Sequence, residues 1–401
     1  MKISILGLAL AIACMSLVVS GCKEVDPPLP EAPSGTKTFG TESNEVGTAI
    51  VNAPGGGYIV AAGVQVDQTD WDLKFLVLDA NGELISEKTI ADPESKHIIR
   101  SMKPKTGGGY LAAGISEGKD QAYQGFFMEL DADLNVESLF STGIGYGYSY
   151  YYNLASYAEA FEINGNGWML LTAQNSVVTI TRVNANFQVI ASRIITDQNV
   201  RGSTPSKELV QDAAGNIMHF TCQDSYLELQ FAMQKLDPNT GYPDLSFDLG
   251  QDSILDPDIY SPLTVGGTCL KSNGNLLVIL TLNLTANYLF EVDPDLGTVL
   301  WAKRLQVAED LFLVKEGADG RIHIAGHTAT SASYYPQTTN SNSLVATVDS
   351  VGGSLRRRAY GGTGQEVVGG LEVAPDGTTA VIGSTSSYGA GGSDIFLILY
   401  N

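Results

Sequence analysis

Short turns rich in Gly, Asn and Asp alternate with apolar runs of strand length throughout the chain after residue 36. One kind of turn occurs seven times, at residues 55–58, 107–110, 164–168, 214–216, 273–275, 319–321 and 376–378. An apolar run follows each copy, as in residues 58–63 and 322–326. Gly, Asn and Asp tolerate the positive φ angles of tight turns, so this pattern predicts β-hairpins.

A second turn follows the first at a nearly constant distance. It begins at Asp79, Asp131, Asn184, Asp237, Asp293 and Asp349, which are 52, 53, 53, 56 and 56 residues apart. Two hairpins in each unit of this length give four strands per unit, and no helical periodicity of comparable strength appears. Seven four-stranded units predict an all-β fold, a seven-bladed β-propeller.

The two ends of the repeat complement each other. The last unit stops after residues 396–400, which form only its third strand, and segment 38–47 parallels segment 359–369. We therefore expect the N-terminal strand to complete the last blade and close the ring, which removes exposed sheet edges. Residues 36–401 then form one propeller domain. A solenoid is the alternative, and it would need capping repeats that the sequence lacks.

The N-terminus predicts export and lipidation. Lys2, a single apolar stretch and small residues at a cleavage site indicate that residues 1–21 are a signal peptide. This segment ends in Val19-Ser20-Gly21-Cys22, which resembles the lipobox of bacterial lipoproteins. The resemblance implies cleavage before Cys22, acylation of Cys22 and attachment to a membrane through the lipid. The alternative is a chance cysteine beside an ordinary cleavage site.

Residues 22–35 follow as the lipidated cysteine and a tether. Pro27, Pro28, Pro30 and Pro33 favour an extended spacer. The acidic segment 23–26 is similar to the sorting signal of Bacteroidota lipoproteins on the outer face of the outer membrane. This resemblance implies a lipid-anchored outer-membrane protein, with the cell surface favoured over the periplasmic face.

Composition limits the kinds of partner, and the sequence does not decide whether the cysteines form a disulfide. The 44 Asp and Glu outnumber the 23 Lys and Arg, so the formal net charge is −21 and we expect no nucleic-acid partner. An apolar fraction of 44% is enough for a core and argues against disorder. Most Asp residues begin turns, where we expect the side chain to accept a hydrogen bond from the backbone two residues on. Cys222 and Cys269 of the propeller form either a disulfide or two separate buried thiols.

The repeats resemble those of β-propeller lipoproteins common in Bacteroidota, whose blades combine a Gly-Gly-Tyr turn, an apolar strand ending in Ala-Gly and a D-x-x-G turn. Residues 360–395 are the best copy, and the resemblance covers residues 36–401. It implies an architecture rather than an activity. Residues 295–301, which end in Trp301, are similar to an element of quinoprotein-type propellers. That similarity implies an outer-membrane assembly scaffold as an alternative function.

The sequence offers few candidates for catalysis. His97, His219, His323 and His327 are its four histidines. His323 and His327 share a face of one predicted strand, as metal ligands would, but no Cys or third His lies at ligand spacing, which favours structural roles. No nucleophile-elbow, P-loop or dinucleotide-binding motif is present. We therefore expect no catalytic residue, metal or cofactor. A carboxylate pair at the central pore, as in a glycan hydrolase or lyase, is the alternative.

Aromatic side chains concentrate at one end of the predicted strands. In a propeller, the connection between the second and third strands of a blade and the connection to the next blade open on the same face. Trp71 and 12 of the 18 tyrosines fall in these connections, namely Tyr123, Tyr146, Tyr148, Tyr150, Tyr151, Tyr152, Tyr157, Tyr226, Tyr260, Tyr334, Tyr335 and Tyr388. Segments 145–153 and 328–343 are also the longest departures from the repeat, and insertions concentrate on binding faces.

These aromatics predict a binding surface. Tyrosine supplies a large amphipathic contact at low entropic cost, which suits docking of a protein or stacking on a sugar. We expect a non-enzymatic binding module whose partner is an outer-membrane or surface protein complex, or an extracellular glycan. The alternative is that the rings fold back and pack against neighbouring blades.

Overall fold

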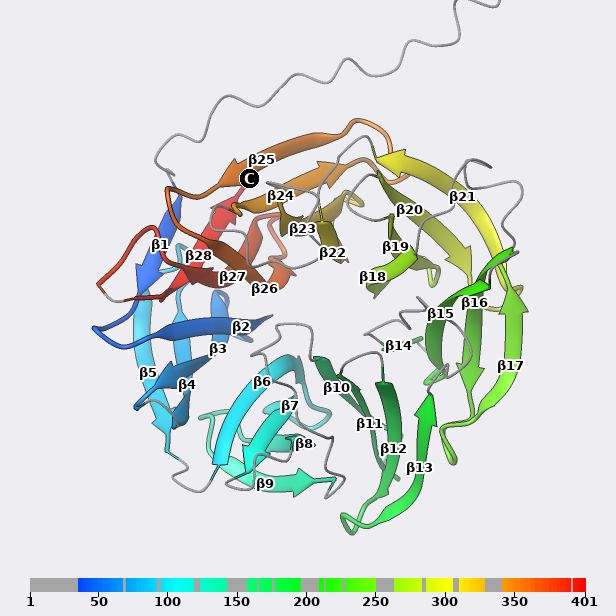
Figure 1. The fold of residues 1–401 in the computed structure, drawn as a ribbon, viewed down its shortest axis with the longest axis horizontal. Helices are drawn as coiled ribbons and strands as arrows, with labels where there is room; N and C mark the ends of the chain where they lie inside the picture. Colours follow the sequence, from blue (N-terminus) through cyan, green and yellow to red (C-terminus); the bar gives the residue numbers. More distant parts are fainter. Residues whose placement is uncertain are drawn as a thin grey trace, which may run out of the picture.

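The computed structural model describes residues 35–401 except 68–69, 92–94, 119–122, 143–156, 164–165, 175–176, 196–208, 213, 226–227, 250–262, 283–285, 306–309, 329–340 and 391. In this part of the chain there are 28 strands and no helix. The strands form seven four-stranded antiparallel sheets, arranged as blades around a common centre (Figure 1). The predicted seven-bladed β-propeller is therefore confirmed. No helix long and apolar enough to cross a membrane occurs among the described residues.

The blades follow one another in chain order. Blades 1 and 2 consist of β2 (Glu45–Asn52), β3 (Tyr58–Gln65), β4 (Trp71–Leu78), β5 (Leu84–Ile90), and β6 (Ser95–Pro104), β7 (Tyr110–Gly118), β8 (Tyr123–Leu130), β9 (Val136–Ser141). Blades 3 and 4 consist of β10 (Tyr157–Glu162), β11 (Gly167–Gln174), β12 (Val177–Asn184), β13 (Val189–Ile195), and β14 (Leu209–Gln211), β15 (Ile217–Ser225), β16 (Glu228–Leu236), β17 (Pro243–Asp248). Blades 5 and 6 consist of β18 (Leu263–Leu270), β19 (Leu276–Leu282), β20 (Ala286–Asp293), β21 (Thr298–Leu305), and β22 (Asp310–Glu316), β23 (Ile322–His327), β24 (Ser343–Val348), β25 (Arg356–Tyr360). Blade 7 consists of β26 (Glu366–Val373), β27 (Thr379–Thr385), β28 (Asp394–Tyr400) and β1 (Thr36–Phe39).

The N-terminal strand closes the ring. β1 pairs antiparallel with β28, with Thr36 opposite Ile398 and Phe39 opposite Ile395. The first described strand of the chain thus becomes the outer strand of the last blade, as the repeat predicted (Figure 1). Because β1 covers β28, the edge of the last three-stranded unit is paired rather than open.

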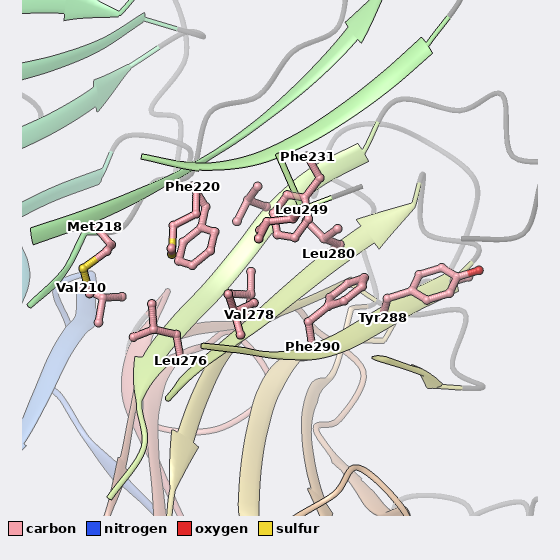
Figure 2. Close-up of a cluster of buried hydrophobic side chains, with 14 residues drawn as sticks. Val210, Met218, Phe220, Phe231, Leu249, Leu276, Val278, Leu280, Tyr288 and Phe290 are labelled. Atoms are coloured by element: carbon pink, nitrogen blue, oxygen red, sulfur yellow. The ribbon is translucent and has the colours of Figure 1, made fainter. Parts of the chain in front are cut away.

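The hydrophobic core lies between blades rather than within one layer. Each of the seven apolar clusters of described residues joins two neighbouring blades, and together the clusters cover all seven blade-to-blade interfaces. Figure 2 shows the cluster between blades 4 and 5, where Phe220 and Phe231 of blade 4 face Val278 and Phe290 of blade 5. The ring centroids of Phe231 and Phe290 are 5.6 Å apart. Cys269 is buried in the equivalent cluster between blades 5 and 6.

Strand position within a blade explains the sequence pattern. The second and third strands pack between two neighbouring blades, so β27 is buried along its whole length. This is why they appear as continuous apolar runs. The fourth strand has exposed side chains along most of its length, as in β5. Bulges interrupt the pairing of several innermost strands, for example between Gly47 and Ala49 and between Val368 and Gly370.

Candidate functional site: the two faces of the propeller

The connections between strands divide the propeller into two faces. We define the turn face by the connections from the first to the second and from the third to the fourth strand of each blade, which are residues 53–57 and 79–83 in blade 1. We define the loop face by the connections from the second to the third strand and from one blade to the next, which are residues 66–70 and 91–94 in blade 1. Because all neighbouring strands are antiparallel, each set of connections opens on one side of the ring.

Acidic and amide side chains on the turn face accept hydrogen bonds from backbone N–H groups of their own turns. The Asp131 carboxylate accepts hydrogen bonds from the N–H groups of Asp133 (2.9 Å) and Asn135 (2.7 Å). The same arrangement begins the corresponding turns of other blades, at Asp79, Asn184, Asp237, Asp293 and Asp349. The prediction that turn carboxylates bond the backbone two residues on is thus confirmed. Hydrogen bonds from the side chain and backbone of Asn135 hold the pKa of Asp131 below its usual range.

A buried polar network adjoins the turn face in blade 5. Glu291 is buried, and its carboxylate accepts hydrogen bonds from Lys271 Nζ (2.7 Å), Trp301 Nε1 (2.8 Å), Asn275 Nδ2 (2.5 Å) and Asn273 Nδ2 (3.1 Å). Burial alone would raise the pKa of Glu291, but the hydrogen bonds from Lys271, Asn275 and Asn273, together with the charge of Lys271, outweigh burial and lower this pKa. Trp301, the residue that carries the quinoprotein-like similarity, thus has a local structural role in its blade.

Carboxylates of the innermost strands join neighbouring blades. Glu159 of β10 forms an ion pair with Lys103 of β6 and accepts a hydrogen bond from the N–H of Leu209 of β14 (2.8 Å). These contacts link blades 2, 3 and 4. Glu372 of β26 forms an ion pair with Lys315 of β22 (3.4 Å), which links blades 6 and 7. These long-range contacts could not be predicted from the sequence. They show that the two carboxylates take part in contacts that join neighbouring blades.

The two histidines of β23 also bridge blades. His323 Nδ1 lies 2.5 Å from Thr379 Oγ1 of blade 7, and His327 Nε2 accepts a hydrogen bond from the N–H of Val368 of β26 (2.8 Å). Burial lowers the pKa of His327 to about 4 and also lowers that of His323. A neutral imidazole is required at His327, because a protonated Nε2 could not accept this bond. Across the described residues, no group of three or more His, Cys, Asp or Glu side chains is placed to hold a metal ion.

The loop face contains the long connections. On the turn face the connections have four to seven residues, whereas on the loop face they have two to 15. The longest loop-face connections are 142–156, 196–208, 249–262 and 328–342, and each has 13 to 15 residues. Three of these four contain predicted binding tyrosines. The large differences in connection length therefore occur on one side of the ring, the loop face.

The predicted rim aromatics fall into three groups. Tyr146, Tyr148, Tyr150, Tyr151, Tyr152, Tyr226, Tyr260, Tyr334 and Tyr335 lie outside the described residues, as does the predicted lipidation site Cys22. Tyr123 and Tyr157 begin β8 and β10 at the loop face, and their side chains are outside the described part. Trp71 and Tyr388 are described in full. The role of the set in binding stays a prediction.

The two described rings lie back against their own blades. Trp71 packs over Gly63, where an added Cβ would come within 3.1 Å of the indole ring. The Tyr388 hydroxyl donates a hydrogen bond to the carbonyl oxygen of Gly361 (2.8 Å), and its ring stacks on Phe396 with the centroids 6.5 Å apart. Burial raises the pKa of Tyr388. At these two positions the rings fold back, but these contacts are with their own blades, whereas the alternative interpretation expected packing against neighbouring blades.

Comparisons with known proteins identify the fold. No protein-family model matches the chain, and no curated protein matches it. Among solved structures, the chain is similar to the β-propeller domain of Cps50 (Swd1) from Myceliophteria thermophila, with 15% identity and a TM-score of 0.52 over 91% of this chain and 100% of that one. It is also similar to a protein of unknown function from Bacteroides caccae (12% identity, TM-score 0.40, 79% and 94% covered) and to the WD40 domain of SCAP from fission yeast (11%, 0.42, 91% and 98%). At 15% identity, the likeness to the Cps50 domain supports the β-propeller fold alone.

Proposed function

We propose that the protein is a lipid-anchored β-propeller of the cell envelope that binds a partner on its loop face without acting as an enzyme. The observation that carries this proposal is the asymmetry of the two faces. On the turn face the same turn geometry repeats from blade to blade, with carboxylates that accept hydrogen bonds from the backbone of their own turn. The long connections that depart from the repeat all belong to the loop face.

The composition of these connections indicates the kind of partner. Connection 142–156 contains Tyr146, Tyr148, Tyr150, Tyr151 and Tyr152, and connection 328–342 contains Tyr334 and Tyr335. Clustered tyrosines suit the core of a protein interface, where aromatic residues supply much of the binding energy. We therefore favour an envelope protein as the partner, with an extracellular glycan as the second candidate.

Partner capture from the native envelope tests the proposal. The variant Y150A/Y151A/Y152A should lose a crosslinked partner that the natural chain recovers. Tyr242 on the turn face offers a matched control, because it is an exposed tyrosine (52%) on the opposite side of the ring, so Tyr242→Ala should retain the partner. Equal capture by both variants, or glycan turnover that depends on pore carboxylates, would overturn the binding-module function.

Membrane attachment has its own test. With Cys22→Ser, the protein should move from the membrane fraction to the soluble fraction, and incorporation of labelled fatty acid should be lost. Membrane association that persists unchanged in this variant would contradict the proposed anchor. Susceptibility of the lipidated protein to protease added to whole cells distinguishes the cell surface from the periplasmic face.

A further inference from the structure

Cationic side chains gather on two neighbouring outer strands of the propeller. β21 of blade 5 carries Lys303 and Arg304, and β25 of blade 6 carries Arg356, Arg357 and Arg358. Neither strand contains an acidic residue, although the chain has 44 Asp and Glu against 23 Lys and Arg. Lys303, Arg304 and Arg356 are exposed, and the other two are half-buried. We call these five residues the basic edge.

The structure brings the turn that precedes β25 into contact with β21. Gly352, in the turn between β24 and β25, lies so close to β21 that an added Cβ would be 2.8 Å from Lys303 Cγ. Leu355 and Trp301 pack against the same apolar cluster between blades 5 and 6. Asp349 is the acidic neighbour of Lys303, and its carboxylate already accepts hydrogen bonds from its own turn. The basic edge therefore extends over the outer strands of two adjacent blades.

The basic edge lies next to the blade from which the tether leaves. β1 is the outer strand of blade 7, and blade 7 packs against blade 6. In Figure 1, β1 and β25 belong to adjacent blades. Thr36 is 14 positions after Cys22, so the tether reaches at most about 50 Å. An anchor at Cys22 therefore keeps β1 within this distance of the membrane surface, and the basic edge begins on the neighbouring blade.

We propose that the basic edge binds the anionic headgroups of the membrane in which the chain is anchored; this rests on the lipid anchor of the proposed function. Electrostatic attraction acts over a Debye length of about 8 Å at physiological ionic strength. Two opposite blades span eight strands, or roughly 38 Å at about 4.8 Å per strand. The blades on the far side of the ring can thus stay several Debye lengths from a surface that the basic edge touches.

This contact would set the orientation of the propeller. A chain with net charge −21 is repelled by an anionic surface unless its positive side is presented. Binding through the outer strands of blades 5 and 6 places the disc edge-on to the bilayer. Both faces then extend away from the membrane plane, and the loop face is left open for its partner.

Vesicle binding of the unlipidated chain tests the basic edge directly. The protein used is residues 22–401 with Cys22→Ser, which contains every described strand, and the probes are phosphatidylcholine vesicles with and without phosphatidylglycerol. We expect binding only to the vesicles with phosphatidylglycerol, weakened by added salt. The variant K303Q/R304Q/R356Q removes the three exposed cations, so it should bind between about ten- and a hundredfold more weakly.

A matched control removes the same charge elsewhere. K88Q/K235Q/R321Q also neutralises three cations, on blades 1, 4 and 6 but outside the basic edge, and it should bind like the parent chain. Thermal unfolding of both variants checks that they are folded. Equal weakening by the two variants, or no binding of the parent chain to phosphatidylglycerol vesicles, overturns the proposal; in the second case an acidic protein would be the better candidate. Because the probe chain lacks the lipid, this outcome is independent of whether Cys22 is acylated and of partner capture by the loop face.

Discussion

The turn face and the loop face are built by the same blade repeat but differ in the length of their connections. On the turn face, short connections recur from blade to blade, and a side chain such as Asp131 or Asn184 binds the backbone of its own turn. The loop face has connections of up to 15 residues. Stability requirements therefore fix the sequence on one side of the ring and leave the other side free to vary.

This difference explains why the acidic residues of this chain need not be the residues that bind a partner. Turn carboxylates and the buried Glu291 are engaged by donors within the protein, so they offer little to a partner. Most of the predicted binding tyrosines belong to long loop-face connections that depart from the repeat. Substitutions on the turn face should thus change stability, and substitutions on the loop face should change binding.

The largest effect is expected from Glu291→Leu. It removes the acceptor of four hydrogen bonds and leaves the buried Lys271 with only the more distant carboxylate of Glu316, at 4.0 Å. Loss of one member of a buried ion pair costs about 3–5 kcal/mol of unfolding free energy. Chemical denaturation measures this loss, and the double variant K271M/E291L should recover part of it. A loss of less than about 1 kcal/mol would show that the network does not stabilise blade 5.

The next effect is a dependence on pH at the contact between blades 6 and 7. Because burial lowers the pKa of His327 from 6.5 to about 4, the folded state favours the neutral imidazole. Its contribution is complete above pH 6.5 and is lost as the pH falls from about 6.5 to about 4, by roughly 2–4 kcal/mol in total. Unfolding midpoints measured across this range should fall for the natural chain and fall less for His327→Gln, whose side-chain oxygen can still accept from Val368. Identical pH profiles would assign the acid sensitivity to other groups.

A smaller effect is expected at a single turn. Asp349→Ala removes the acceptor for the N–H groups of Val351 and Gly353, which should cost about 1–2 kcal/mol. Asp349→Asn is the matched control, since Asn184 makes the same contacts in blade 3. The Asn variant should be close to the natural chain in thermal stability. If Ala and Asn behave alike, the turn carboxylates do not hold the turn face together.

The smallest effect on stability is expected for the loop-face tyrosines. Y150A/Y151A/Y152A should change the free energy of unfolding by less than about 0.5 kcal/mol, as is usual for substitutions away from the core. Denaturation of this variant alongside Glu291→Leu therefore separates the two faces. A loss of stability comparable to that of Glu291→Leu would mean that these tyrosine side chains pack against the blades of the propeller, as Tyr388 does.

The repeat predicted most of the fold because its signals are local. Turn residues at fixed spacing and apolar runs between them determined the number of strands, and the unfinished last unit predicted that β1 would pair with β28. The contacts that join blades could not be predicted in this way. Glu159 meets Lys103 and Leu209 only after three blades are placed side by side, and nothing in the local pattern of these residues indicates it.

The basic edge is a second feature that could not be fully predicted from the sequence. The run from Arg356 to Arg358 is visible in the sequence, but Lys303 and Arg304 join it only because neighbouring blades align their outer strands. The loop-face tyrosines were predicted from connection position, which the strand order supports. Their packing could not be predicted, because long connections depart from the repeat that orders the rest of the chain.

The most direct test of the two-face account is oxidative footprinting of tyrosines in the intact envelope and in the purified protein. Tyr150, Tyr151 and Tyr152 on the loop face should be less oxidised in the envelope, where the partner covers them. Tyr242 on the turn face, exposed by 52%, should be oxidised equally in both samples. Protection of Tyr242 with unchanged oxidation of the loop-face tyrosines would contradict the assignment of binding to the loop face.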